Sequence, residues 1–161
     1  RMFEHFSRVQ GTKTALIRLN YACELRYGVL TDIARQIWGG EPVDVSMGWF
    51  NTLWQADANA MTLAALTDAA SPPKLVNVTG PEKLRIRDVA TEFGRLLGKP
   101  VTFTGAEQAT ALLNNAHPAL TRYGQPRANI DTLMRWITDW IKQGGATLNK
   151  PTHFESRDGK F

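Results

Sequence analysis

The sequence predicts an α/β fold, and three observations support this prediction. Residues 12–19 run through Ala15, Leu16 and Ile17 as a strand that is apolar on both faces, as in sheets covered by helices on both sides. Residues 74–104 predict a strand, a helix and a second strand, which is a βαβ unit with parallel pairing and a right-handed crossover. Further amphipathic helices are expected between the remaining short strands.

The composition is that of a globular protein with one ordinary domain. The 161 residues are 43% hydrophobic and 21% charged, and no apolar run approaches the roughly 20 residues of a membrane span. Cys23 is the only cysteine, so no internal disulfide can form, and we expect a cytoplasmic protein. The net charge of +4 is dispersed, with Lys83, Arg85 and Arg87 as the densest basic group. We therefore expect no nucleic-acid or membrane partner.

The first predicted helix lacks a recognisable start. Met2, Phe3, Phe6 and Val9 lie on one helical face, and Gly11 is placed to end the helix. No capping Ser, Thr, Asp or Asn stands before it, and there is no initiator Met. We therefore expect that further residues precede this helix in a longer parent protein.

The following elements are justified by apolar spacing and by their end signals. We expect a helix over residues 30–37 ended by Gly39-Gly40, and short strands over 42–46 and 50–54 around Gly48. Asp57 is expected to cap a helix over 58–70, which is apolar nearly all round and should be buried on several sides.

The second half of the chain carries the clearest helical pattern. The expected elements are a strand over 74–78, a helix over 86–97 ended by Gly98, a strand over 101–104, a short helix over 109–114, and a last helix over 130–141 closed by Gly144-Gly145. The tail over 146–161 has no periodicity, so we expect it to run extended over a surface.

Four segments occur in a familiar order: "ALIRLN", "GEPVDV", "NTLWQADANAMTLAAL" and "KLVNVTGPEKLRIRDVATEFGRLLGKPVTFTG". This order resembles the C-terminal half of extended short-chain dehydrogenase/reductases, the NAD-dependent epimerase/dehydratase family. The last segment is similar to the family's strand, loop and helix ending in a Leu-Gly pair. "WQADANA" resembles the family's His-Val-Asp-Asp segment, with Asp57 on the second Asp.

The resemblance implies a Rossmann-type α/β fold of which this chain holds one part. Residues 1–27 would be the last helix and strand of a truncated dinucleotide-binding domain. Residues 28–145 would mainly form a small α/β substrate-binding lobe, whose helix over 58–70 packs back on the dinucleotide domain. Residues 146–161 would be the extended C-terminal tail.

The family's catalytic Tyr-x-x-x-Lys pair and its glycine-rich phosphate-binding turn do not occur in this sequence. We therefore assign no catalytic residue to this chain and expect it to be inactive alone. The resemblance implies that the intact parent is an oxidoreductase. It would use NAD or NADP, bound mainly by the N-terminal half.

The candidate ligand site is the loop after the first strand, because ligands of parallel sheets bind beyond the carboxyl ends of the strands. The family loop, commonly Arg-Pro-Phe-Asn-Val-Tyr-Gly-Pro, passes the nicotinamide and the substrate, and this chain has "RLNYACELRYG". The resemblance assigns cofactor contacts to Asn20 and Tyr21, and substrate contacts to Glu24, Arg26, Tyr27, Trp54 and Gln55. The alternative is an ordinary polar loop held by a salt bridge.

Cys23 lies in the same loop and raises the question of a nucleophile. A catalytic cysteine needs a nearby base, and a small buried hydrophobe is the simpler interpretation. No spacing of His, Cys, Asp and Glu fits a metal-site pattern, so we predict no metal site.

Two positions bear on the substrate. Family members that bind nucleoside-diphosphate sugars often carry one Arg ahead of the His-Val-Asp-Asp segment and a second in an Arg-x-Gly-Asp stretch. Asn51 stands at the first position, and the second region, "TGAEQATAL" with Glu107, contains no Arg. Since bidentate Arg suits a diphosphate, we expect a smaller polyol, sugar or carbonyl compound.

We therefore expect the substrate-binding half of an enzyme that acts on a hydroxyl or carbonyl carbon of a sugar-like or other small polar substrate. The alternative is a non-catalytic relative that serves as a binding or regulatory module. The strand at 15–18 and the helix with Met61, Ala65 and Leu66 should pack against the N-terminal half or a second copy of the chain.

Overall fold

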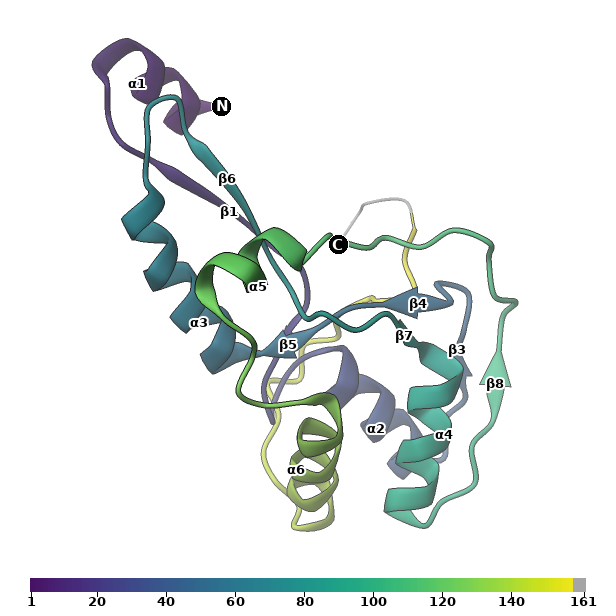
Figure 1. The fold of residues 1–161 in the computed structure, drawn as a ribbon. Helices are drawn as coiled ribbons and strands as arrows, with labels where there is room; N and C mark the ends of the chain where they lie inside the picture. Colours follow the sequence, from purple (N-terminus) through teal and green to yellow (C-terminus); the bar gives the residue numbers. More distant parts are fainter. Residues whose placement is uncertain (158–161) are drawn as a thin grey trace.

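The computed structural model describes residues 1–157 and has a mixed α/β architecture (Figure 1). The helices are α1 (Met2–Gln10), α2 (Val29–Gly39), α3 (Gln55–Ala64), the 3-10 helix η1 (Ala65–Asp68), α4 (Ile86–Leu97), α5 (His117–Tyr123) and α6 (Ile130–Lys142). The strands are β1 (Ala15–Leu19), β2 (Ala22–Cys23), β3 (Val43–Asp44), β4 (Trp49–Phe50), β5 (Leu53–Trp54), β6 (Lys74–Val78), β7 (Leu84–Arg85) and β8 (Phe103–Thr104).

The strands form separate pairs. β1 and β6 run parallel, with Ala15 opposite Lys74 and Leu19 opposite Val78. β2 pairs with β5 and β3 with β8, both in parallel, while β4 and β7 are antiparallel. The predicted βαβ unit over 74–104 is therefore wrong in its pairing, although its three elements exist. α3 instead lies within the crossover from β1 to β6, and α4 within the crossover from β3 to β8.

Two hydrophobic clusters hold the structure together. The larger one joins α2, α4 and α6 through fully buried side chains such as Ile33, Phe93 and Ile137. The smaller one joins β6, α3 and α5 through residues such as Val76 and Met61. In Figure 1, α2, α4 and α6 gather together, while α1, β1, β6 and part of α3 extend away from them.

The helices with the strongest apolar stripes lie where the sequence predicts them. α4 covers residues 86–97, and Gly98 ends it in the left-handed conformation with φ 70°. α1 ends at Gly11 and α2 at Gly40 in the same way. α6 begins one residue after Asn129, whose side chain accepts a hydrogen bond from the Thr132 N–H.

The first strand and the third helix are less buried than predicted. β1 is not covered on both faces, because Ala15 to Ile17 are half-buried and Leu19 is 52% exposed. In α3, Met61 is buried by other parts of this chain, whereas Leu66 in the following η1 is 66% exposed. The helix is thus buried on one side only.

Asp57 is not the cap of α3, since the helix begins at Gln55 with Trp54 in the capping position. Asp57 instead lies in the first turn, where it is buried and accepts a hydrogen bond from the Ala128 N–H at 3.2 Å. Its carboxylate thereby connects α3 to the segment that leads into α6.

Two other predicted elements need correction. No helix forms over residues 109–114; a helix begins later, at His117, with Pro118 in its first turn. The strand predicted over 50–54 is divided into β4 and β5 by two residues, Asn51 and Thr52, whose side chains bond to other segments.

The tail follows the surface without regular structure as far as residue 157, and the rest of the predicted segment lies outside the described residues. Phe154 anchors the tail, because its side chain is only 2% exposed and joins the larger cluster. Thr152 donates from both its N–H and its hydroxyl to Asp32 at 2.7 Å. None of the helices within residues 1–157 has the length and hydrophobicity that crossing a bilayer requires.

Candidate functional site

The loop after β1 lies at the carboxyl ends of two parallel strands. Asn20 continues the strand pairing by donating its N–H to the Val78 carbonyl at 3.0 Å. The chain then turns through Tyr21 into β2, which pairs with β5. The predicted ligand residues from Asn20 to Tyr27 are therefore brought to the sheet end at which α/β proteins bind ligands.

Asn51 holds this loop in place through its side chain. That side chain is 5% exposed, and its Nδ2 donates to the carbonyls of Asn114 at 2.8 Å and Gly80 at 3.3 Å. Its Oδ1 accepts from Asn20 Nδ2 at 2.8 Å. Both Nδ2 donors of Asn51 and one N–H of Asn20 Nδ2 are directed at protein acceptors, so Asn20 Oδ1 and the second Asn20 N–H are left to face a ligand.

Gly80 is needed for this arrangement. A Cβ added there would lie 1.8 Å from the Thr52 carbonyl oxygen, which no backbone can accommodate without moving. The close approach allows Gly80 to offer its carbonyl to Asn51. Neither Gly80 nor Asn114, whose carbonyls both accept from Asn51, could be recognised from the sequence pattern.

Tyr21 is held in an unusual backbone conformation, with φ 45°. Its carbonyl accepts hydrogen bonds from the Leu53 N–H at 3.2 Å and from the Thr52 hydroxyl. Burial, followed by the nearby Glu155 carboxylate, raises the pKa of the Tyr21 phenol. The phenol is therefore neutral at ordinary pH and able both to donate and to accept a hydrogen bond.

Cys23 is a buried structural residue. The side chain is 0% exposed, and its Sγ lies 3.0 Å from the Thr52 hydroxyl. Burial raises the pKa of the Cys23 thiol, so the nucleophilic thiolate is disfavoured. This geometry supports the interpretation of Cys23 as a small buried hydrophobe.

Glu24, Arg26 and Tyr27 form a tight turn before α2. The backbone N–H of Glu24 donates to the Tyr27 carbonyl at 2.8 Å, and Arg26 Nε lies 3.0 Å from both Glu24 carboxylate oxygens. The Arg26 side chain is 53% exposed. The turn thus presents a guanidinium to solvent with Glu24 as its counter-ion.

The other two predicted substrate residues point to different neighbours. Trp54 packs edge-on against Trp136, with ring centroids 5.5 Å apart. Gln55 donates to Asn59 Oδ1 at 3.0 Å along the surface of α3. Within residues 1–157 neither side chain forms a hydrogen bond to the loop from Asn20 to Tyr27.

The C-terminal tail borders the loop from Asn20 to Tyr27. This contact was not predicted from the sequence. The Leu148 N–H donates to the Arg26 carbonyl at 3.2 Å. Further along, Thr152 is bound to Asp32 of α2, and burial raises the pKa of that carboxyl group. No local pattern in the tail marks these contacts, which span more than 100 residues.

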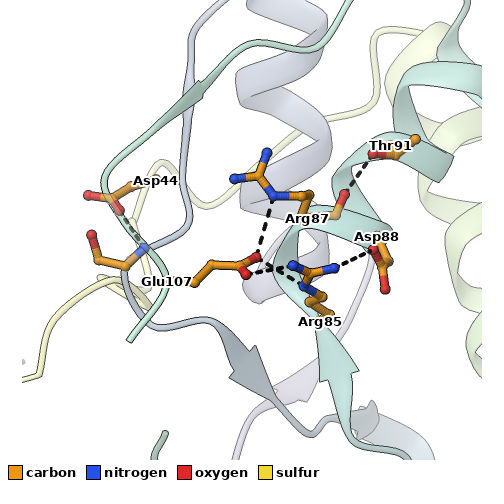
Figure 2. A network of polar contacts seen from close by, with 7 residues as sticks. Asp44, Arg85, Arg87, Asp88, Thr91 and Glu107 are labelled. Atoms are coloured by element: carbon orange, nitrogen blue, oxygen red, sulfur yellow. Dashed lines mark hydrogen bonds and ion pairs between the residues drawn. The ribbon is translucent and has the colours of Figure 1, made fainter. Parts of the chain in front are cut away.

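Glu107 lies in a separate cluster of charged side chains (Figure 2). Arg85 binds its carboxylate through two hydrogen bonds of 2.7 and 3.1 Å, and Arg87 Nε lies 3.5 Å away. The hydrogen bonds from Arg85 lower the pKa of Glu107. The segment around Glu107 contains no Arg, but Arg85 at the end of β7 and Arg87 in the first turn of α4 lie against it in the folded chain. Glu107 neutralises part of the charge of these two side chains.

Comparison with known proteins identifies the fold. Neither a family model nor a curated protein matches the sequence. Among solved structures, the UDP-glucuronic acid 4-epimerase of Bacillus cereus in complex with NAD is similar over 96% of this chain and 50% of its own, with a TM-score of 0.73 and 16% identity. The UDP-glucose 4-epimerase of Thermus thermophilus, also with NAD, is similar over 88% of this chain and 50% of its own, with a TM-score of 0.66 and 15% identity.

A third similar structure is the UDP-glucose 4-epimerase of Thermotoga maritima with UDP-glucose, with a TM-score of 0.68 and 13% identity over 89% of this chain. The expected α/β fold is therefore confirmed, and over the matched residues it is the fold of these NAD-containing and sugar-nucleotide 4-epimerase structures. The chain spans about half the length of the solved structures that it matches.

Proposed function

We propose that the chain is the substrate-binding half of an NAD(P)-dependent oxidoreductase of the epimerase/dehydratase type. The observation that carries this proposal is the position of a polar loop, Asn20 to Tyr27, at the carboxyl end of β1 in a fold shared with NAD-containing sugar epimerases. The reaction would occur at a hydroxyl or carbonyl carbon of a sugar-like or other small polar substrate.

The residues present fit only one edge of a dinucleotide. Asn20 Oδ1 and the neutral Tyr21 phenol offer hydrogen bonds to a nicotinamide amide or a ribose hydroxyl. A pyrophosphate needs a glycine-rich turn at a helix start, and the sequence has none. Bound NAD(P) would supply hydride chemistry, and this chain would orient it while the N-terminal half holds most of it.

Glu24, Arg26 and Tyr27 would contact the substrate from the tight turn before α2. A guanidinium paired with a carboxylate provides both donors and acceptors, which suits a polyhydroxylated molecule. A diphosphate is best bound by Arg side chains that are not already paired with a carboxylate. Position 51 holds Asn, whose side chain is bound to Asn114, and Arg85 is paired with Glu107. Both observations support a substrate smaller than a nucleoside-diphosphate sugar.

The surface beside β1 supports association with the N-terminal half. Among the described strands β1 pairs only with β6, so its other edge is free. Several large apolar side chains near this end of the molecule are exposed, namely Met2, Phe3, Val9, Leu63 and Leu66. A free strand edge beside apolar side chains favours pairing with further polypeptide.

The test compares this chain with the protein extended by the residues encoded before Arg1. We expect calorimetric titration of NAD and NADP to give no saturable heat with the 161-residue chain and one bound dinucleotide per extended chain. Tight stoichiometric binding to the 161-residue chain would contradict the proposal, as would an extended protein that lacks a Tyr-x-x-x-Lys pair and binds no dinucleotide.

A further inference from the structure

A cavity of about 490 Å³ lies between β6 and α5, with η1 closing one side. Its volume is in the range typical of small-molecule sites. The residues that line it include none of the loop from Asn20 to Tyr27, so it is distinct from the candidate site above. In Figure 1, α5 lies beside the carboxyl-terminal end of β6, whereas α1 lies beyond the opposite end of the β1–β6 pair.

The cavity follows the free edge of β6, whose only partner within residues 1–157 is β1. The Lys74 N–H donates to Thr14 and the Val78 carbonyl accepts from Asn20, so these two residues direct their backbone groups toward β1 and its extensions. Because orientation alternates along a strand, the backbone groups of Leu75 and Asn77 point toward the free edge. Backbone N–H groups at a sheet edge contribute to anion-binding hollows.

The side chains that line the cavity carry a positive excess. Three of them are cations, Arg18, Lys74 and Arg122, and one, Asp68, is a carboxylate. Asp68 is already bound by the Arg122 guanidinium, at 2.6 and 2.8 Å, and by the Tyr123 hydroxyl at 2.8 Å. Within residues 1–157, neither Arg18 nor Lys74 belongs to any of the ion pairs.

The remaining wall is apolar. Leu75 is half-exposed at the cavity, and Pro118 and Ala119 of α5 face it from the other side. A ligand held here would therefore place an anionic group against the two unpaired cations and an apolar body against these side chains. Two cations match a phosphate monoester, which carries about two negative charges at neutral pH.

We propose that this cavity binds a small organic phosphate, with its phosphate group at the free edge of β6, where Arg18 and Lys74 reach it from opposite faces of the β1–β6 pair, and its organic part against Leu75 and α5. Arg122 is held by Asp68 and shapes the entrance. The proposal is independent of the epimerase/dehydratase function. It assigns a ligand site next to the segment that supports Asn51, since Asn115 lines the cavity and the neighbouring Asn114 binds Asn51.

The test is a titration of the isotope-labelled 161-residue chain with phenyl phosphate, followed through the backbone amide resonances. We expect saturable shifts at Leu75, Asn77 and Arg122. Benzoate, which carries one negative charge, and inorganic phosphate, which lacks the organic part, should each bind at least about threefold more weakly. Replacing both cations, Arg18→Gln with Lys74→Gln, should weaken phenyl phosphate binding about tenfold or more.

Two controls separate this site from general charge effects. Lys83→Gln removes a cation that lies over the Trp49 ring instead, and it should leave the affinity unchanged. The charge-retaining pair Arg18→Lys with Lys74→Arg should keep binding and show that both positions tolerate substitution. The proposal is overturned if phenyl phosphate causes no saturable shifts up to about 10 mM, or if its shifts are confined to residues 20–27. It is also overturned if the double Gln variant binds phenyl phosphate as tightly as the parent, or if benzoate or inorganic phosphate binds as tightly as phenyl phosphate.

Discussion

Asn20 Nδ2 donates a hydrogen bond to Asn51 Oδ1 over 2.8 Å and so joins the loop after β1 to the junction between β4 and β5. The same Asn51 side chain binds the carbonyls of Asn114 and Gly80. One buried carboxamide therefore connects four segments that are distant in sequence. The position of the candidate ligand loop depends on this residue.

Asn51→Ala should destabilise the protein strongly. The substitution leaves the buried Gly80 carbonyl, the part-buried Asn114 carbonyl and the part-buried Asn20 amide without their partner, at a cost of up to about 1–3 kcal/mol for each unsatisfied group. Urea unfolding measures the loss. Asn59→Ala is the control, because within residues 1–157 the Asn59 side chain accepts only an exposed hydrogen bond from Gln55, and the free energy of unfolding of this variant should change by less than about 0.5 kcal/mol.

Gly80→Ala should destabilise the protein strongly although it adds only one methyl group. The added methyl group would lie 1.8 Å from the Thr52 carbonyl oxygen, so the backbone must shift and the Asn51 contacts are lost with it. We expect an unfolding midpoint well below that of the parent. Gly39→Ala is the matched control, since the nearest atom lies 3.9 Å from its added Cβ and alanine favours the helix by about 0.5–1 kcal/mol. Equal effects of the two substitutions would contradict this account.

The parts of the fold that could be predicted are those encoded locally. The apolar stripe of α4 and the left-handed Gly98 are both determined by residues within a few positions, and the predicted helix over 86–97 is correct. Strand pairing is not local. β6 could be recognised as a strand, but its partner β1 lies more than 50 residues away, and nothing in residues 74–104 favours β1 over β8.

The site shows the same division. Its loop could be located because it follows a strand, and the residue types from Asn20 to Tyr27 indicated polar chemistry. Its supports could not be predicted. Asn51 binds across 31 and 63 residues, and Phe154 of an aperiodic tail enters the larger core. Such contacts depend on the folded arrangement of distant segments, which periodicity does not describe.

Asp68 should make stability depend on pH in the acid range. The Arg122 and Tyr123 hydrogen bonds lower the pKa of Asp68 to about 2. Because the pKa is lower in the folded state than in the unfolded chain, the stabilisation is present above about pH 4 and is lost as the pH falls toward 2. Asp68→Asn should flatten the stability–pH curve in this window, as measured by urea unfolding at several pH values. Asp139→Asn controls for the loss of one exposed carboxylate, and an equal flattening there would contradict the assignment.

Cys23 should resist thiol reagents in the folded protein. Its side chain is 0% exposed, and burial raises the pKa of its thiol, so both access and thiolate formation are disfavoured. We expect labelling by a chromogenic disulfide at pH 8 to proceed only as fast as the protein opens, and to become rapid in concentrated urea. Rapid stoichiometric labelling of the folded chain would instead support a reactive cysteine in the loop.

Arg26→Ala in the extended parent should reduce turnover while leaving stability nearly unchanged. An exposed ion pair such as Arg26 with Glu24 contributes at most about 1 kcal/mol, so the melting temperature should change little. Loss of a charged hydrogen bond to the substrate should lower kcat/KM about tenfold or more. Arg95→Ala is the matched control, because Arg95 forms a comparable exposed pair with Glu92 on α4 and should leave both quantities unchanged. If Arg26→Ala has the same kcat/KM as the parent, the residue belongs to a solvated turn and the substrate is bound elsewhere.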